Sequence, residues 1–295
     1  MKLLARFNLI FIAIFGVGAI LVIALAYVFL RNDAKEQVFE QAKLMMETTV
    51  AVRSYTTGQI EPLLTKFQKQ SAIFLPQTVP AYSATQVFGN IHKLNPDYSY
   101  KEATLNPTNL ADRAADWEAD VVNTFRNDPA RTSLSGERDT PTGRSMFYAH
   151  PIKVTNTACL DCHSTPARAP RSLVHQYTSE HGFGWKLNEI VGAQIVSVPE
   201  ALPIAIADRE LMRLIAYLVL LALVALAVLD AVLIATVIRP VAKLSRLTDE
   251  ISQGKVDVED IPVTGRDEIS VLAASFNRMK RSLAKAIRLL ESRGA

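Results

Sequence analysis

The two cysteines of the chain, Cys159 and Cys162, lie three positions apart, and His163 follows the second one directly. Cys-x-x-Cys-His is the attachment motif of a c-type haem. Two thiols one helical turn apart can form thioethers with the two vinyl groups of a haem, and the adjacent imidazole is then placed to bind the iron. The motif predicts one covalently attached haem, with His163 as its proximal iron ligand.

Three other uses of paired cysteines fit the sequence less well. A thioredoxin-like site normally opens a helix in a βαβ pattern, whereas this motif leads into a loop rich in proline and small residues, 164–170. A structural zinc site needs four ligands, and the sequence has no second Cys/His pair with zinc-finger spacing. A disulfide across two intervening residues would be strained. The haem interpretation is favoured.

Two apolar runs, 8–30 and 214–238, are long enough to cross a hydrocarbon core of about 30 Å. The first exceeds the apolar region of a cleaved signal peptide, so we expect a retained anchor. Basic residues flank the outer end of each run: Lys2, Arg6, Arg239, Lys243 and Arg246. The positive-inside rule then places both termini, beginning with 1–7, in the cytoplasm. The sequence predicts a two-pass protein of a bacterial inner membrane, with 31–213 in the periplasm.

Asp230 is the only charged residue inside the second run. An ionisable residue in a membrane span is a functional candidate by default. A proton relay would need further such residues, so a hydrogen-bonded carboxyl between the helices of a dimer is the favoured interpretation. The formal net charge of +3, without a basic cluster, gives no reason to expect a nucleic-acid partner.

The external segment is long enough for one domain with its own core. A helix is expected over 33–65, weakened by Pro62, and a second over 110–125. Residues 145–154 alternate as a half-buried strand does, and 190–198 form a second candidate strand. These elements predict an α+β fold in which an antiparallel sheet is flanked by helices, with the haem motif in the loop after the first of the two strands.

Four stretches of this segment carry a family resemblance: 78–85, 98–109, 159–170 and 182–187. They resemble the periplasmic PAS-like c-haem domains, a family with cyanobacterial members. The resemblance covers most of 40–200. It implies a PAS-like fold, one covalently held haem and a sensory role.

The sixth position on the iron has several candidate ligands. Related haem sensors take a distal ligand from the first helix, which here offers Met46 or Met45. A second histidine is the alternative, with His150 ahead of His92, and an open or water-bound site is a third possibility. The family also allows a cysteine, but no third cysteine exists in this chain.

Groups that suit the haem propionates or a bound ligand are cationic or hydroxylic. By residue type and family resemblance, the pocket candidates are Tyr82, Lys101 and Arg144, together with His150. Each of them also has the simpler interpretation of an ordinary surface or core residue.

Residues 239–290 show a second pattern after the second apolar run. A short helix with an apolar stripe through Leu244 and Ile251 is expected first, followed by a polar connector. A second helix then carries an a/d alternation through Leu272 and Phe276. This arrangement resembles a HAMP domain, which implies a parallel four-helix coiled coil in a homodimer. The tail 291–295 adds no catalytic motif, so we expect a separate cytoplasmic output protein.

Taken together, these features predict a membrane sensor in which a redox change or a small gas alters the ligation of the haem iron. No catalytic residue is predicted, and the protein is not expected to be an enzyme. The main alternative is a membrane-tethered electron-transfer cytochrome, against which the HAMP-like segment counts. A haem enzyme is disfavoured because no convincing catalytic His/Arg pair is present.

Overall fold

The computed structural model describes residues 3–141, 143–255, 257–263 and 265–291, without the side chains of residues 69, 70, 290 and 291. The end of the predicted tail, 292–295, lies outside the described residues. The chain forms two compact units. One comprises Met1–Leu25 with Met212–Ala295, and the other comprises Ala26–Leu211.

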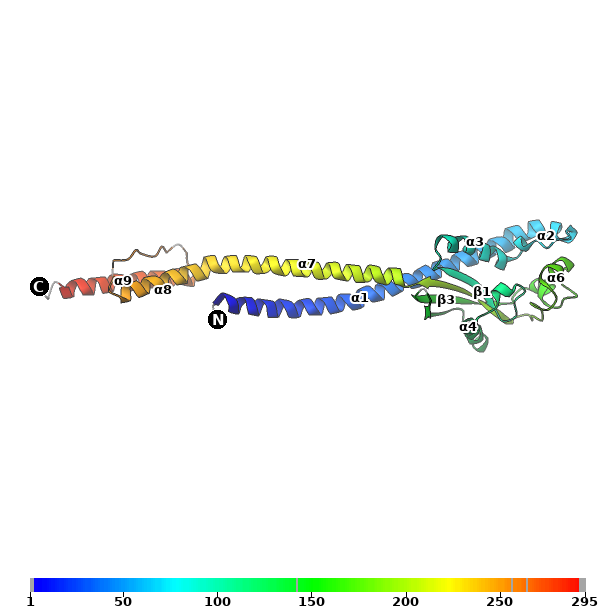
Figure 1. Cartoon of the computed structure of the whole chain (residues 1–295), viewed down its shortest axis with the longest axis horizontal. Coiled ribbons are helices and arrows are strands. Elements are labelled where there is room, and N and C mark those ends of the chain that lie inside the picture. Colours follow the sequence, from blue (N-terminus) through cyan, green and yellow to red (C-terminus); the bar gives the residue numbers. More distant parts are fainter. Residues whose placement is uncertain (1–2, 142, 256, 264, 292–295) are drawn as a thin grey trace. The chain divides into compact units, whose positions relative to one another are not determined.

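The first helix, α1 (Leu3–Tyr55), contains the first predicted span and continues without a break into the domain between the two spans (Figure 1). Its apolar window is long enough to cross a membrane, and so is that of the helical stretch Ala201–Ser252. Neither window is buried within the described part of the protein, unlike the core helix of a soluble protein. The structure thus agrees with two candidate membrane helices that flank this domain.

The helix that was expected to weaken at Pro62 continues beyond it. A π-helical turn, η1 (Thr56–Ile60), links α1 to α2 (Glu61–Gln70), in which Pro62 is the second residue. Proline lacks an N–H and its ring clashes with the carbonyl four residues earlier. The wider π turn accommodates both effects, so the helical path extends to Gln70.

The domain between the two spans contains a four-stranded antiparallel sheet in the order β1-β4-β3-β2. The strands are β1 (Ser99–Thr104), β2 (Leu134–Thr140), β3 (Gly143–Lys153) and β4 (Ile190–Pro199). The two predicted strands correspond to β3 and β4, whereas β1 and β2 were not predicted. Strand β4, paired with β1 on one side and β3 on the other, is buried along almost its whole length, including its polar residues Gln194 and Ser197.

Helices cover both faces of the sheet, and each face has its own apolar cluster. On one face, α4 (Asp116–Asn127) buries Val122 and Phe125 against Ala193 and Ile195 of β4. On the other face, α1 packs against Val196 and Val198. The predicted α+β architecture, an antiparallel sheet with flanking helices, is confirmed.

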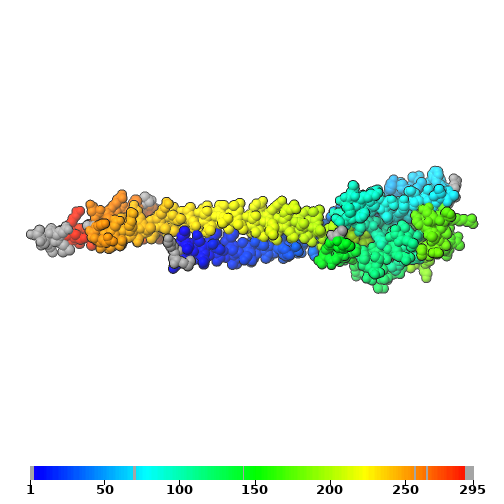
Figure 2. Space-filling view, viewed as in Figure 1, coloured from blue at the N-terminus to red at the C-terminus, as the bar shows by residue number. Residues whose placement is uncertain are grey.

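The remaining elements of this unit are short. They are η2 (Pro76–Thr78), α3 (Pro80–Leu94), η3 (Leu110–Asp112), α5 (Cys159–His163) and α6 (Arg171–Tyr177). Figure 2 shows the surface of α2 (cyan) next to that of α6 (green), where Gln68 donates a hydrogen bond to Ser172 at 3.2 Å. The long connection between β3 and β4, which holds α5 and α6, is therefore tied to the helical segment that follows α1.

The other unit contains the second span. Its elements are α7 (Ala201–Leu233), which begins in the unit Ala26–Leu211, the π turn η4 (Ile234–Ile238), α8 (Arg239–Ser252) and α9 (Glu268–Glu291). Leu244, Leu247 and Ile251 of α8 form an apolar cluster with Ala273 and Phe276 of α9. The two amphipathic helices predicted here are thus observed and pack against each other.

Asp230 is hydrogen-bonded within this unit. Its Oδ2 accepts a hydrogen bond from Nδ2 of Asn8 in the first span of the same chain, at 3.1 Å. The predicted hydrogen-bonded carboxyl is observed, and its partner belongs to the same chain.

Candidate haem site

The two cysteines lie on α5, a single helical turn between β3 and β4. The side chain of Asn156 accepts a hydrogen bond from the Ala158 amide at 2.9 Å and so starts this turn. Side chains three positions apart on a helix share one face, which matches the spacing that two thioethers need. Both thiols are free and partly buried. The predicted loop position is therefore correct in the chain, but the motif itself is helical.

The alternative uses of the thiols find no support in the described residues. Cys159 and Cys162 are not joined in a disulfide. No group of three or more His, Cys, Asp or Glu side chains in that part of the chain is arranged to hold a metal ion. Zinc binding through the motif therefore lacks a ligand set there.

The imidazole of His163 is oriented by a backbone carbonyl. Its Nδ1 lies 2.8 Å from the carbonyl oxygen of Gly182. Because that oxygen can only accept, Nδ1 carries the hydrogen and Nε2 is the unprotonated nitrogen. Burial lowers the pKa of His163, which keeps the ring neutral, although the Gly182 carbonyl acts in the opposite direction. A neutral imidazole with Nε2 available is the form that binds iron.

One face of the imidazole is covered by Trp185. The two rings are stacked, with centroids 3.9 Å apart and planes 8° from parallel. The backbone holds them together, because the amide of Trp185 donates to the carbonyl of His163 at 3.1 Å. This contact was not predicted from the sequence, although Trp185 lies in a stretch that carries the family resemblance.

Gly182 occupies a position that only glycine fits. Its φ is +81°, and a Cβ there would lie 2.0 Å from Oγ1 and 2.7 Å from Cα of Thr108. Left-handed backbone is costly for residues with a Cβ. Close packing against Thr108 therefore sets where the Gly182 carbonyl lies relative to His163.

An apolar wall adjoins the thiols. Phe74, Ala169 and Leu173 are buried there, and Cys162 and Phe183 pack against them. Burial is the largest cause of a raised pKa of the Cys162 thiol, followed by the negative charges of Asp161 and Glu61. Two unpaired thiols, an imidazole with one nitrogen available and an apolar wall together match what a covalently held haem requires.

The candidate distal methionines lie in a different apolar cluster from Cys162. Met46 is fully buried with Val196 and Val198 of β4, and Met45 packs at the edge of the same cluster. Sulfur side chains fill such sites readily. The structure therefore does not bring Met46 next to the thiols.

The histidine alternatives are engaged elsewhere. His150 lies in the middle of β3, with Nε2 3.3 Å from the hydroxyl of Tyr148, and burial lowers its pKa. His92 is exposed, and its Nδ1 lies 2.8 Å from the carbonyl oxygen of Tyr98.

Two of the three other pocket candidates already have carboxylate partners. Arg144 stands at the β2–β3 hairpin, 3.3 Å from Glu137, at the end of β3 opposite to that leading to α5. Lys101 lies 2.7 Å from Glu118. Tyr82 is half-buried in α3. The structure does not gather these side chains around Cys159.

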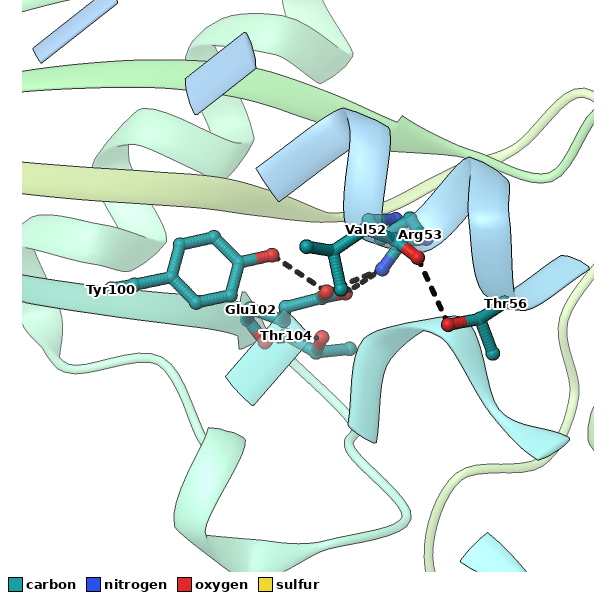
Figure 3. A network of polar contacts seen from close by, with 6 residues as sticks. All are labelled: Val52, Arg53, Thr56, Tyr100, Glu102 and Thr104. Carbon is teal, nitrogen blue, oxygen red and sulfur yellow. Dashed lines mark hydrogen bonds and ion pairs between the residues drawn. The ribbon is translucent and has the colours of Figure 1, made fainter. Parts of the chain in front are cut away.

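A buried polar network lies where α1 crosses the sheet, and the sequence did not reveal it (Figure 3). The guanidinium of Arg53 contacts both carboxylate oxygens of Glu102, which also accepts a hydrogen bond from the hydroxyl of Tyr100 at 2.6 Å. Although burial acts to lower it, the pKa of Arg53 is raised by the charge of Glu102. This network fixes α1 to β1.

Comparison with known proteins agrees with this architecture. A profile described as Tll0287-like matches residues 31–199, and a HAMP domain profile matches residues 232–285. No curated protein matches the chain. Among solved structures, the cyanobacterial heme-protein Tll0287 is similar at 16% identity with a TM-score of 0.42, covering 55% of this chain and 94% of that one. Because the first profile matches more than half of the chain, this protein belongs to the Tll0287-like family, and a HAMP domain follows its family domain.

Proposed function

We propose that this protein is a membrane-anchored c-type haem sensor that signals through its HAMP domain to a separate cytoplasmic protein. The observation that carries the proposal is the geometry at His163. Nδ1 is bonded to the Gly182 carbonyl, Nε2 has no hydrogen-bond partner among the described residues, and both thiols lie in the same helical turn. Few arrangements other than axial ligation of a tethered haem use this combination.

The residues of the site have separate roles in this proposal. Cys159 and Cys162 hold one haem as thioethers, and His163 supplies the proximal ligand. When bound, the haem supplies an iron that changes oxidation state or takes a small gas. The apolar wall next to Cys162 excludes water. Of the pocket candidates, Tyr82 and His150 would serve carboxylates or a ligand, whereas Lys101 and Arg144 are paired with Glu118 and Glu137.

Met46 or Met45 is the proposed distal ligand, with His150 as the alternative. Met46 packs between α1 and β4, in a cluster that does not include Cys162. Ligation by Met46 would couple α1 to the iron held at segment 159–163. Since α1 continues into the first span, this coupling provides a physical link between iron ligation and the membrane.

The proposed topology follows the distribution of charge around the two spans. Residues 8–30 and 214–238 cross an inner membrane, 31–213 lie in the periplasm, and both 1–7 and 239–290 lie in the cytoplasm. Periplasmic placement is supported by the chemistry of the motif, because haem c is attached outside the cytoplasm.

The HAMP domain is proposed to relay the signal as a homodimer. Leu272 and Met279, which belong to the predicted a/d stripe of α9, are each 50% exposed in the single chain. A second copy would cover them in a parallel coiled coil. Two packings of that coiled coil would be the states presented to the output protein.

Haem attachment is tested first, on the full-length protein matured in a host competent for c-type cytochromes. A haem stain on a denaturing gel should be positive, and it should be lost in Cys159→Ala/Cys162→Ala. Optical spectra of Met46→Leu, Met45→Leu and His150→Phe in both oxidation states then identify the distal ligand. A wild-type protein without covalent haem would contradict the proposal.

Signalling is tested by disulfide crosslinking through a cysteine introduced at Leu272, with the haem oxidised and then reduced. The control is Val271→Cys, one residue away and outside the predicted stripe. The sensor proposal expects crosslinking at position 272 to differ between the two oxidation states. Identical yields in both states would favour the electron-transfer cytochrome instead.

A further inference from the structure

Asn106 links two loops that are far apart in the sequence. It follows the end of β1 by two residues, and its side chain bridges to the segment 182–185. Its Oδ1 accepts a hydrogen bond from the amide of Gly182, and its Nδ2 donates one to the carbonyl of Phe183, both at 3.1 Å. One side chain thus fixes the two peptide groups on either side of the Gly182–Phe183 peptide.

The carbonyl that orients His163 lies between these two contacts. The amide of Gly182 is held by Asn106, and the carbonyl of the same residue accepts from Nδ1 of His163 at 2.8 Å. Gly182 and Gly184 both have positive φ, +81° and +85°. The φ and ψ torsions of glycine are less restricted than those of other residues. A contact from another part of the chain is therefore needed to hold the Gly182 carbonyl in one direction.

The other end of the same segment is fixed to α5. The amide of Gly184 donates to the carbonyl of Ser164 at 3.0 Å, and the amide of Trp185 donates to that of His163 at 3.1 Å. These two bonds secure the backbone that places Trp185 on the ring. They leave the orientation of the Gly182 peptide to Asn106 and to its packing against Thr108.

We propose that Asn106 is a positioning residue for the proximal ligand: by bridging Gly182 and Phe183 it holds the carbonyl that fixes the tautomer and the direction of the His163 ring. This inference rests on the proposed haem function. It assigns Asn106 no contact with the iron and no part in attaching the haem.

The chemical consequence concerns the electron density on Nε2. A firm Nδ1–H···O bond makes an imidazole a stronger donor to a metal, and hydrogen bonds of this kind to a metal-binding imidazole tune the metal. Stronger donation favours the oxidised iron. Weakening the bond should therefore raise the midpoint potential of the haem.

The test compares Asn106→Ala and Asn106→Leu with Asn109→Ala in the full-length, haem-loaded protein. Asn109 lies in the same loop, and within the described part of the chain its side chain accepts a hydrogen bond only from the Ala111 amide, at 3.2 Å. We expect equal haem content in all variants. The midpoint potential should rise by a similar amount in both Asn106 variants and should not change in Asn109→Ala. The iron–imidazole vibration in resonance Raman spectra should shift with it.

Equal potentials in wild type and Asn106→Ala, at equal haem content, would overturn the inference. A shift in Asn106→Ala that is absent in Asn106→Leu would also overturn it, because side-chain volume rather than hydrogen bonding would then be responsible. If the wild type carried no haem, the proposed function would be contradicted, but the role of Asn106 in holding the Gly182 carbonyl would still be testable. Hydrogen exchange at the Gly182 amide would then decide the role of Asn106, since it should be faster in Asn106→Ala than in wild type.

Discussion

Arg53, near the end of α1, lies with its guanidinium against both carboxylate oxygens of Glu102 in β1 (Figure 3). The Glu102 side chain is 6% exposed and that of Arg53 25% exposed. A buried ion pair stabilises the fold little more than two apolar side chains in its place would. Removing one partner, however, leaves the other charge buried and uncompensated. The pair therefore ties the first helix to the sheet at a position where neither residue can be removed alone.

Removing one partner of this pair should cost far more than removing both. We expect Arg53→Met or Glu102→Leu to lower the free energy of unfolding by about 3 kcal/mol, since an uncompensated buried charge remains. Arg53→Met/Glu102→Leu should lose less than either single variant. Denaturant unfolding measures these values. The exposed pair Lys43–Glu40 is the control, expected to contribute below about 1 kcal/mol. Additive losses in the double variant would contradict the coupling.

Asp112 should make stability depend on pH in the acidic range. Burial, and next the negative charge of Glu102, raise the pKa of Asp112 to about 6, while Lys101 opposes them. The folded protein therefore holds a proton that the unfolded chain loses near pH 4. It follows that the contribution of Asp112 to the free energy of unfolding falls as pH rises from about 4 to about 6.

Asp112→Asn should remove the contribution of Asp112 to the pH dependence of the free energy of unfolding between about pH 4 and pH 6. Unfolding curves at pH 4, 5, 6 and 7 for wild type and Asp112→Asn test this, because other titrating groups contribute equally to both. Parallel pH profiles for the two proteins would show that Asp112 titrates normally.

Gly182→Ala should disturb the site without disturbing the rest of the domain. The added methyl group would meet Thr108 at the distances given above, and the left-handed backbone adds strain of about 1–2 kcal/mol. We expect haem to be attached but the iron spectrum to become heterogeneous, because the carbonyl that orients His163 is displaced. Gly89→Ala is the control, since nothing lies within 4 Å of its would-be Cβ and its φ is not positive. A wild-type spectrum in Gly182→Ala would contradict the assigned role of this carbonyl.

Asn277 holds the connector between the two helices of the HAMP domain. It is buried, and its side chain both donates to the carbonyl of Ile261 at 2.8 Å and accepts from its amide at 3.0 Å. Asn277→Leu leaves both backbone groups unpaired and should lower the stability of this domain by about 2 kcal/mol. The rate of proteolysis in the connector 254–263 should rise accordingly. The control is Ser275→Ala, since Ser275 is a partly buried residue of the same helix. This variant should leave the rate of proteolysis unchanged.

The sequence allowed the apolar strands and the haem motif to be predicted, but not the polar parts of the fold. β3 was recognisable from its alternation, and β4 from the stretch 190–198, which follows a turn-rich segment and ends before a proline. β1 was missed because Lys101 and Glu102 interrupt any apolar pattern, and both are neutralised only by distant partners, Glu118 and Arg53. Pairing between elements, rather than local pattern, makes that strand.

The site shows the same division. The spacing of Cys159, Cys162 and His163 alone predicts covalent attachment of a haem. The carbonyl of Gly182 and the ring of Trp185 reach His163 only because two glycines take a left-handed backbone. The sequence of the segment 182–185 does not show which side chain it will contact in the fold. These contacts could therefore be identified only in the structure.

The two π turns have a consequence for rebuilding this protein. η1 and η4 each stand directly before a helix whose second residue is proline, Pro62 in α2 and Pro240 in α8. A π turn takes in one extra residue, and one residue rotates everything beyond it by about 100°. The five residues 234–238 therefore set the rotational phase between the second span and the helix that follows. A chimaera that joins this span to another cytoplasmic module therefore keeps the native rotational angle between the two helices only if all five residues of that turn are included.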